Sequence, residues 1–315
     1  MVELLRNVGM ETCKPLSTPM STTAPVTSND SKPFDDPTAY RSLVGSLMYL
    51  LITRPDLSYA VNRLCQFMHS PTEEHWVTLK RVMRHIQGTR ELGLRFTPTT
   101  TPVLHTFSDS DWAGCSVDRK STGGYAVFLG PNLVSWASRK QRTVARSSTE
   151  AEYKALADAA TEVTWVQSLL RELGLHPPTV PVLWCDNLGA TYLCSNPVFH
   201  ARTKHVEVDY HFVRDKVTTV QMKVNFVSTH DQLADVFTKP LPTQLKVYCF
   251  DSIHGNKELT DIKNIIDKIF SNSYCRPAVT VYSSWSTRIY AKLTQQIYQP
   301  LNLTSGCSQG SIFCL

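Results

Sequence analysis

Val103-Leu-His-Thr-Phe-Ser-Asp109 and the apolar segments that follow it decide the fold class of this 315-residue chain. Residues 103–108 are predicted to form a strand, followed by strands over Gly124–Leu129 and Leu133–Ala137. The turn Gly130-Pro131-Asn132 joins the second strand to the third. Three strands in succession place a sheet in the middle of the chain.

The segments after these strands alternate between helices and strands. Glu150–Leu173 is predicted to be a long helix, because small and apolar residues recur at three- and four-residue steps. Ser147 and Glu150 have the spacing of a capping box, and Gly174 suits the C′ position. The remaining predicted elements are a strand over Val180–Cys185, helices over Asn187–Cys194 and Thr203–Lys216, a strand over Val224–Val227 and a helical turn over Gln232–Phe237. The order β-β-β-α-β-α-α-β-α indicates an α/β fold, a mixed sheet with helices on its faces.

The two ends of the chain differ from this middle part. Residues 17–38 are rich in Ser, Thr, Pro and Asp and are predicted to be a linker or an irregular loop, and apolar residues at helical spacing follow over Tyr40–Leu50, Ser58–His69 and Thr72–Gln87. Residues 243–315 lose this regularity, apart from a candidate amphipathic helix over Lys257–Phe270. We therefore expect a linker and small helical unit over 1–98, an α/β domain over 99–242 and a poorly ordered tail over 243–315.

Composition narrows the class of protein. Hydrophobic residues make up 42% of the chain, enough for a sizeable core, and no apolar run approaches the roughly 20 residues of a membrane span. The N-terminus lacks the pattern of a secretion signal. A net charge of +5 is compatible with nucleic-acid binding. The nine cysteines include no Cys-x-x-Cys pair, which favours reduced thiols over a disulfide or zinc framework.

Four acidic residues stand at distinctive places in the predicted order. Asp109 and Asp186 each end an apolar strand, Glu150 opens the long helix, and Asp235 follows the last strand. Singly, each is explained as a turn residue, a helix-start charge, an N-cap or a solvated helix residue. Together, sheet geometry can bring them to one end of the sheet, and three or four carboxylates are what two Mg²⁺ ions need.

Two neighbouring side chains extend this hypothesis. Asp111 shares a strand face with Asp109, since side chains repeat at every second residue. His230 follows the last strand, where a histidine on a loop beside a metal cluster could shuttle protons. An ordinary surface histidine is the alternative.

The chain closely resembles the C-terminal part of copia-type LTR retrotransposon Pol polyproteins over roughly Glu3–Pro242. The motifs that carry the resemblance are Tyr40-Arg-Ser-Leu-Val-Gly-Ser-Leu-Met-Tyr-Leu, Thr53-Arg-Pro-Asp-Leu, Asp109-Ser-Asp-Trp-Ala-Gly, Asp118-Arg-Lys-Ser-Thr-Gly-Gly-Tyr, Ser135-Trp-Ala-Ser-Arg-Lys-Gln, Ser147-Ser-Thr-Glu-Ala-Glu-Tyr, Thr203-Lys-His-Val-Glu-Val-Asp-Tyr-His-Phe and Ala234-Asp-Val-Phe-Thr-Lys-Pro-Leu. So dense a set is far more specific than one short motif.

The resemblance implies the end of a reverse transcriptase followed by a ribonuclease H-like domain that cleaves RNA in RNA–DNA hybrids with two Mg²⁺ ions, Mn²⁺ being possible. The implied catalytic and metal-binding carboxylates are Asp109, Glu150, Asp186 and Asp235, with His230 as the loop histidine. Asp109 is preferred to Asp111 by its strand-end context. Glu150 is preferred to Glu152, which lies about 200° further around the helix and is expected to point elsewhere.

The chain also departs from the family. Its one Asp-Asp pair, Asp35-Asp36, precedes Pro37 in a polar stretch and resembles a helix entry rather than a polymerase hairpin. No polymerase activity is expected, and residues 1–98 would be a thumb and connection remnant that lacks palm and fingers. An inactive remnant or a domesticated nucleic-acid-binding protein is the alternative to an active nuclease. A DDE-type integrase is disfavoured by the order and contexts of the acidic residues.

Basic side chains near the predicted site are candidates for holding phosphates without reading sequence. They are Arg119, Lys120, Arg139, Lys140, Arg142, Arg146, Arg202 and Lys204. A solvated charged face is the alternative. Trp112, Trp136 and Trp184 are expected in the core rather than as stacking platforms. The resemblance implies a cytoplasmic virus-like particle or the nucleus as location, with no membrane partner.

Overall fold

A mixed five-stranded sheet forms the centre of the computed structural model, which describes residues 1–22, 31–97, 103–175, 177, 179–195 and 207–241. The strands are β1 (Leu104–Asp111), β2 (Thr122–Leu129), β3 (Asn132–Lys140), β4 (Val182–Cys185) and β5 (Lys223–Phe226). Their order is β3-β2-β1-β4-β5. β1 pairs antiparallel with β2, and β2 with β3, whereas β4 pairs parallel with β1 and with β5. The predicted mixed sheet is confirmed.

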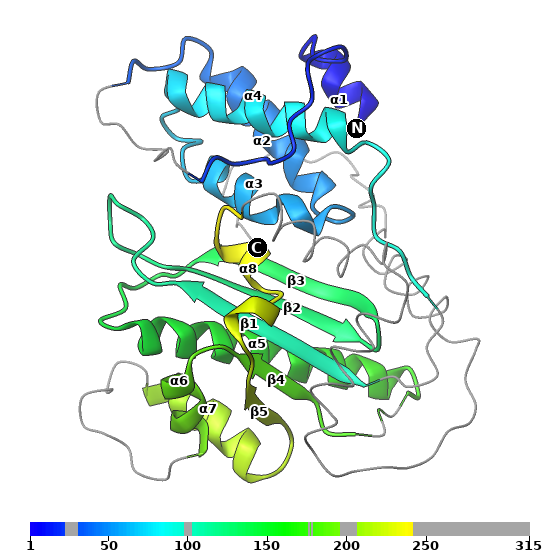
Figure 1. Ribbon diagram of the computed structural model, residues 1–315, viewed down its shortest axis with the longest axis vertical. Helices are drawn as coiled ribbons and strands as arrows, with labels where there is room; N and C mark the ends of the chain where they lie inside the picture. Colours follow the sequence, from blue (N-terminus) through cyan, green and yellow to red (C-terminus); the bar gives the residue numbers. More distant parts are fainter. Residues whose placement is uncertain (23–30, 98–102, 176, 178, 196–206, 242–315) are drawn as a thin grey trace, which may run out of the picture.

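Helices cover both faces of this sheet (Figure 1). On one face lie α5 (Ser148–Glu172), α6 (Leu188–Ser195) and α7 (Glu207–Thr218). On the other face lies α8 (Asp235–Thr238), reached from β5 through the 3-10 turn η3 (Thr229–Asp231). Alternate residues of β1 serve the two cores: Leu104 packs with α5, and Phe107 packs with α8.

Two adjacent glycines, Gly123 and Gly124, allow helices to pack closely on both faces of the sheet beside Asp109. Gly124 of β2 pairs with Asp109 of β1, and a Cβ at Gly124 would lie 2.6 Å from Phe237 Cβ of α8. On the opposite face, a Cβ at Gly123 would lie 3.4 Å from Ala155 Cβ of α5. Gly124 therefore allows α8 to pack directly against the end of β1, because any side chain at position 124 would collide with α8.

The helical unit consists of α1 (Val2–Asn7), α2 (Pro37–Leu50), the 3-10 turn η1 (Pro55–Leu57), α3 (Ser58–Cys65) and α4 (Glu73–Gly88). The Asp36 carboxylate accepts hydrogen bonds from the Thr38 and Ala39 amides, so it caps α2 as the helix-entry interpretation predicted. α1 was not predicted, and α3 ends at Cys65 rather than His69. Met20 is buried in the core of this unit, so the predicted linker is tied down there.

An ion pair is buried inside the helical unit. Arg54 Nε lies 2.8 Å from Asp56 Oδ1, and both side chains are fully buried. Arg54 also donates to the carbonyl and the hydroxyl of Thr89, at 2.9 and 2.8 Å. His85 Nε2 lies 3.7 Å from Asp56 Oδ2. The Thr53-Arg-Pro-Asp-Leu motif therefore joins the start of α3 to the end of α4.

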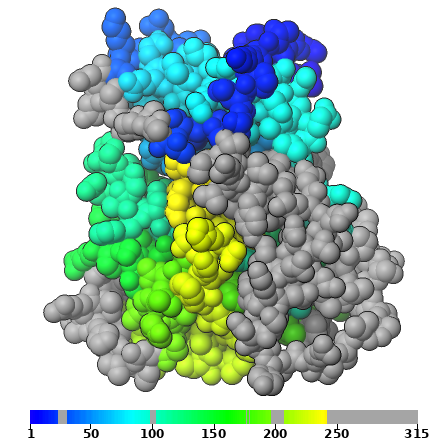
Figure 2. All heavy atoms as spheres, viewed as in Figure 1, coloured from blue at the N-terminus to red at the C-terminus, as the bar shows by residue number. Residues whose placement is uncertain are grey.

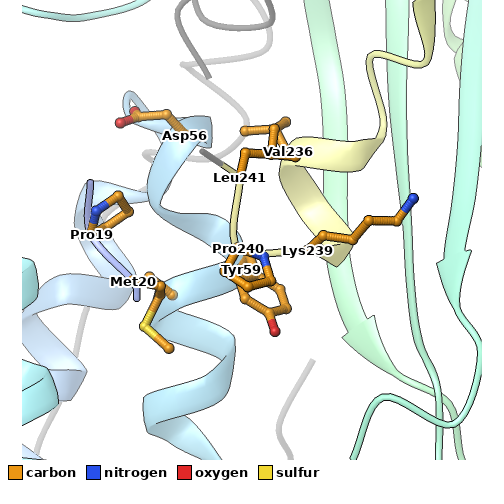
Figure 3. Close-up of a pocket in the computed structure, with 9 residues that line it drawn as sticks. Pro19, Met20, Asp56, Tyr59, Val236, Lys239, Pro240 and Leu241 are labelled. Atoms are coloured by element: carbon orange, nitrogen blue, oxygen red, sulfur yellow. The ribbon is translucent and has the colours of Figure 1, made fainter. Parts of the chain in front are cut away.

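The helical unit contacts the sheet through α3, which packs against β3 and α8. Asn62 Nδ2 donates to Ser138 Oγ at 3.4 Å. In Figure 2 the yellow segment that ends the described chain runs across this face and reaches the blue unit. Figure 3 shows the hollow between them, lined by Pro19, Met20, Asp56, Tyr59, Ala60, Val236, Lys239, Pro240 and Leu241. Its cavity volume is about 20 Å³, room for roughly one water.

Several predictions fall outside the described residues. They are the tail over 243–315, its candidate helix over Lys257–Phe270, and the start of α7 before Glu207. The division into 1–98, 99–242 and 243–315 stays a prediction. None of the helices in the described ranges is long and apolar enough to cross a membrane.

Candidate metal centre

Three of the predicted carboxylates meet at the end of β1. Asp109 belongs to β1, Asp186 follows β4, and Asp235 opens α8. One carboxylate oxygen of each lies within 4.8 Å of the others. β1 and β4 are parallel neighbours, with Ser108 opposite Cys185, so their carboxyl ends deliver Asp109 and Asp186 to the same edge.

The glutamate that lies at this cluster is Glu152, which was expected to point elsewhere. The predicted ligand Glu150 makes its contacts outside the cluster. Glu152 is buried, and its Oε1 accepts a hydrogen bond from the Ser110 amide at 3.2 Å. It forms a second group of possible ligand atoms with Cys185 and Asp186, again within 4.8 Å. The negative charges of Asp109 and Asp186 lie close enough to Glu152 to raise its pKa.

Glu150 caps the helix instead. Its amide donates to Ser147 Oγ at 3.2 Å, and its carboxylate accepts from the Arg146 amide at 3.0 Å. Its other oxygen lies 2.7 Å from Lys154 Nζ. Glu150 is therefore a negative charge at the start of a helix, which was the alternative to its role as a metal ligand.

A sequence signal for Glu152 was present. Glu152 is in phase with Leu156, Ala159 and Val163, the buried stripe of α5 that faces the sheet. Glu150 is in phase with Lys154. A carboxylate in an apolar stripe is directed inward, and it needs a partner there.

Side chains from the segment after β5 hold these carboxylates, and sequence reasoning missed them. Gln232 is buried, and its Nε2 donates to the Ser108 carbonyl at 2.9 Å and to Asp186 Oδ1 at 3.4 Å. Thr229 Oγ1 donates to Asp186 Oδ2 at 3.2 Å. Thr238 Oγ1 donates to Asp109 Oδ2.

Lys239 brings a positive charge into the cluster. Its Nζ lies 2.7 Å from Asp235 Oδ1 and 3.3 Å from Asp109 Oδ2. These carboxylates raise the pKa of Lys239 against the opposing effect of its burial. No sequence argument had assigned Lys239 a place at the site.

Burial and repulsion from neighbouring carboxylates raise the pKa values of Glu152, Asp186 and Asp235. Burial, then Asp109 and Asp186, raise the pKa of Glu152 to about 10. Burial and Asp109 raise the pKa of Asp235 to about 7, and the same two causes raise that of Asp186. Such a crowd of carboxylate oxygens suits hard divalent cations, because a bound cation offsets the repulsion and displaces the protons. The donor set therefore fits Mg²⁺ or Mn²⁺.

Cys185 adjoins this donor set but suits it poorly as a thiolate. Its Sγ lies 4.0 Å from Glu152 Oε2, and burial raises the pKa of the thiol. A buried neutral thiol behaves as a small apolar side chain.

His230 and Asp111 lie outside these groups of ligand atoms, as far as the described residues show. His230 is exposed on η3, one residue after Thr229. Asp111 accepts a hydrogen bond from the Thr122 amide, and burial raises its pKa to about 7 while Arg63 of α3 opposes that rise.

The basic candidates divide into exposed and engaged side chains. Arg119, Arg139, Arg142 and Arg146 are exposed. Lys140 Nζ lies 2.9 Å from Asp118 Oδ2 and Lys120 Nζ 3.8 Å from the same atom. Arg202 and Lys204 lie outside the described residues.

The expectation that all three tryptophans belong to the core is wrong for Trp112. Trp112 is 52% exposed, and its Nε1 donates to the Ala145 carbonyl at 3.1 Å. The Trp112 ring therefore lies beside Ala145, within the 139–146 segment. Trp184 is buried in the core, and Trp136 packs against that core while partly buried.

Sheet order and carboxylate placement together define a ribonuclease H-like α/β fold with a candidate metal centre. The chain belongs to the retrovirus-related Pol polyproteins of copia-type transposons, as its sequence relatives show. It is 53% identical over 240 residues to the Pol polyprotein from transposon RE2 and 52% identical over 240 to that from RE1, both of Arabidopsis thaliana. It is 36% identical over 267 residues to that from transposon TNT 1-94 of Nicotiana tabacum.

These alignments cover most of this chain but little of its relatives. They span 76% of this chain and 16% of the RE2 and RE1 polyproteins, and 80% of this chain and 20% of the TNT 1-94 polyprotein. No protein-family model matches the chain.

Among solved structures, the N-terminal RNase H domain of Rv2228c from Mycobacterium tuberculosis aligns over 48% of this chain and 99% of its own. The identity is 13% and the TM-score 0.32. LC11-RNase H1 aligns over 44% of this chain and 94% of its own, with 11% identity and a TM-score of 0.35. The fold assignment rests on the strand order β3-β2-β1-β4-β5.

Proposed function

We propose that this chain is the ribonuclease H part of a retrotransposon Pol polyprotein and hydrolyses RNA in RNA–DNA hybrids. One observation carries the proposal: carboxylates from β1, α5, the end of β4 and α8 converge on one spot at the end of the sheet. The raised pKa values of Glu152, Asp186 and Asp235 are typical of a functional site. The similarity of the chain to Pol polyproteins supports reverse transcription as the context.

Asp109, Glu152, Asp186 and Asp235 would hold two Mg²⁺ ions, or Mn²⁺. Such a pair supplies an activated water and stabilises the leaving oxygen of a phosphodiester. One carboxylate oxygen of Asp109 lies within 4.8 Å of those of Asp186 and Asp235, so Asp109 would hold a cation together with both. Thr238, Thr229 and Gln232 orient the carboxylates through the hydrogen bonds described above. His230, exposed on η3, would carry protons between this site and solvent.

Substrate would be held by the exposed side chains beside the site. Arg139, Arg142 and Arg146 would contact phosphates, which gives affinity without sequence preference. Trp112 offers an exposed ring next to this segment for packing against a sugar or base. Contacts to 2′-hydroxyls in the wide minor groove would select the RNA strand.

The helical unit would serve as the thumb and connection end of the reverse transcriptase, whose palm and fingers are the expected partners. α3 packs on both β3 and α8, which supports a role in holding the nuclease segment. The implied location, a cytoplasmic virus-like particle or the nucleus, follows from this context.

The test is cleavage of a labelled RNA–DNA hybrid by the full chain in Mg²⁺. We expect cuts in the RNA strand of the hybrid, none in duplex DNA, and loss of cleavage in EDTA. Asp186→Asn is the inactive control, since it keeps the hydrogen-bond partners of Asp186 but removes a ligand charge. Cleavage no greater than that of the Asp186→Asn chain contradicts the proposal, and hybrid binding without cleavage would support the nucleic-acid-binding alternative.

A further inference from the structure

Lys239 is the charged side chain at the cluster for which the proposed mechanism has no role. Its ammonium nitrogen lies 2.7 Å from Asp235 Oδ1 and 3.3 Å from Asp109 Oδ2. Within the described part of the chain, it is the one cation with an ion pair to these carboxylates.

The backbone places Lys239 there. Its amide donates to the Asp235 carbonyl at 3.0 Å, so it closes the turn of α8 and stands four residues from Asp235. In Figure 3 the side chain points away from Tyr59 and Met20 and toward the strands. The lysine stem therefore packs along the hollow, while its charged end reaches the carboxylates.

The two oxygens that Lys239 contacts belong to two of the proposed metal ligands. A divalent cation bound to Asp109 and Asp235 would take up the same lone pairs and would repel the ammonium group at short range. The Lys239 side chain keeps 34% of its surface exposed, so it can turn to solvent without opening the core.

We infer that Lys239 is an internal counter-ion, and that its ammonium group and a divalent cation bind Asp109 and Asp235 in mutual exclusion. Lys239 thus stabilises the metal-free centre and weakens its affinity for Mg²⁺. The inference rests on the proposed metal centre, but it concerns cation binding and stability rather than cleavage.

The test compares the wild-type full chain with Lys239→Met, which keeps the length and packing of the stem. Calorimetric titration with Mg²⁺ alone, without nucleic acid, is expected to give about tenfold tighter binding in the variant, or about 1.4 kcal/mol. In EDTA the variant is expected to melt about 2–4 °C lower. Saturating Mg²⁺ should close that gap. Lys239→Arg keeps the charge and should remain close to wild type in both measurements.

Lys154→Met is a matched control. Lys154 also pairs with a carboxylate four residues away, Glu150, at 2.7 Å, but outside the cluster. Its removal should leave Mg²⁺ affinity unchanged.

Each result decides the inference separately from the proposed nuclease. Equal or weaker Mg²⁺ binding by Lys239→Met, or no detectable binding by either chain, overturns it. Tighter binding by Lys239→Met supports it even if the chain never cleaves a hybrid.

Discussion

The main-chain amide of Ser110 donates a hydrogen bond of 3.2 Å to Oε1 of Glu152. This bond fastens α5 to the end of β1, one residue beyond Asp109. It also directs the second Glu152 oxygen toward Cys185 and away from solvent. Burial and the charges of Asp109 and Asp186 raise the pKa of Glu152 to about 10, although the Ser110 amide opposes that rise, so a bound cation would favour the charged carboxylate and link metal binding to the local fold.

Glu152→Gln is expected to abolish Mg²⁺ binding at this centre while leaving the metal-free chain about as stable as wild type. The amide mimics the protonated carboxyl that prevails at neutral pH, because the pKa of Glu152 is raised to about 10. Calorimetric titration with Mg²⁺ and urea unfolding in EDTA measure the two effects.

Glu150→Gln is the matched comparison, two residues away on the same helix. It should bind Mg²⁺ normally and lose about 0.5–1 kcal/mol of stability with its helix-start charge. The reverse pattern would restore Glu150 as the ligand.

Gly124→Ala should lower the free energy of unfolding by about 1–3 kcal/mol and weaken Mg²⁺ binding. The added Cβ would lie 2.6 Å from Phe237 Cβ, so α8 must move away and take Asp235 with it. Gly45→Ala in α2 is the control, since nothing lies within 4 Å of its added Cβ. That variant should be slightly more stable than wild type, by about 0.5–1 kcal/mol. Equal behaviour of the two variants would contradict the close packing of α8 on β2.

Asp56→Asn should destabilise the helical unit by about 3–5 kcal/mol, because it leaves Arg54 buried without a counter-charge. Arg54→Lys should also destabilise the helical unit although it keeps the positive charge. One ammonium group cannot reach Asp56 and both Thr89 oxygens as the guanidinium does. Chemical unfolding followed by circular dichroism measures both. A loss below about 1 kcal/mol would mean that the pair is not buried in solution.

The free energy of unfolding of the Asp111→Asn variant should increase relative to that of the wild type as pH rises from about 4 to 7. The pKa of Asp111 is raised to about 7 in the folded chain against an ordinary value of 3.8. Between these values the folded chain holds a proton that the unfolded chain has lost, so wild-type stability falls with rising pH.

The difference between variant and wild type in EDTA should change by about 1–3 kcal/mol over that range. Taking a difference matters, because the lowered pKa of His105, about 4, gives the opposite slope. A pH-independent difference would show that the Asp111 carboxyl is not buried as described.

Trp112→Ala should weaken binding of an RNA–DNA hybrid by about 1–3 kcal/mol without changing Mg²⁺ affinity. The control is Trp165→Ala on α5, because Trp165 is 53% exposed and Trp112 is 52% exposed. Fluorescence anisotropy with a labelled hybrid in Ca²⁺ measures the affinity. Equal losses in both variants would assign the effect to general surface change.

Local patterns were sufficient for most of the fold. β1, β2, β3 and α5 were predicted within a few residues, because period-two and period-3.6 patterns are properties of contiguous sequence. The order of elements indicated a mixed sheet. The short α1 was missed, because six residues are too few to display a helical period.

Part of the candidate metal centre was also predicted from local sequence patterns. Asp109 and Asp186 end strands, and a strand end can be located from the apolar run before it. Glu150 was chosen over Glu152 because both open the same helix, and the phase of Glu152 with the apolar residues Leu156 and Val163 was not used. The buried stripe that includes Leu156 and Val163 settles how α5 is turned about its axis, and packing against the sheet creates that stripe.

The sequence by itself determined the class of fold, the family, and three carboxylates of the candidate centre, because these depend on local periodicity and on dense motifs. The tertiary structure showed that Glu152, whose helical phase is readable in the sequence, completes the cluster, and it alone decided that Lys239 enters it. Residues Gln232, Thr238 and Lys239 lie more than 120 positions from the β1 residues that they contact, and no local pattern encodes that docking. It depends on the missing side chain at Gly124, which allows α8 to reach the end of β1.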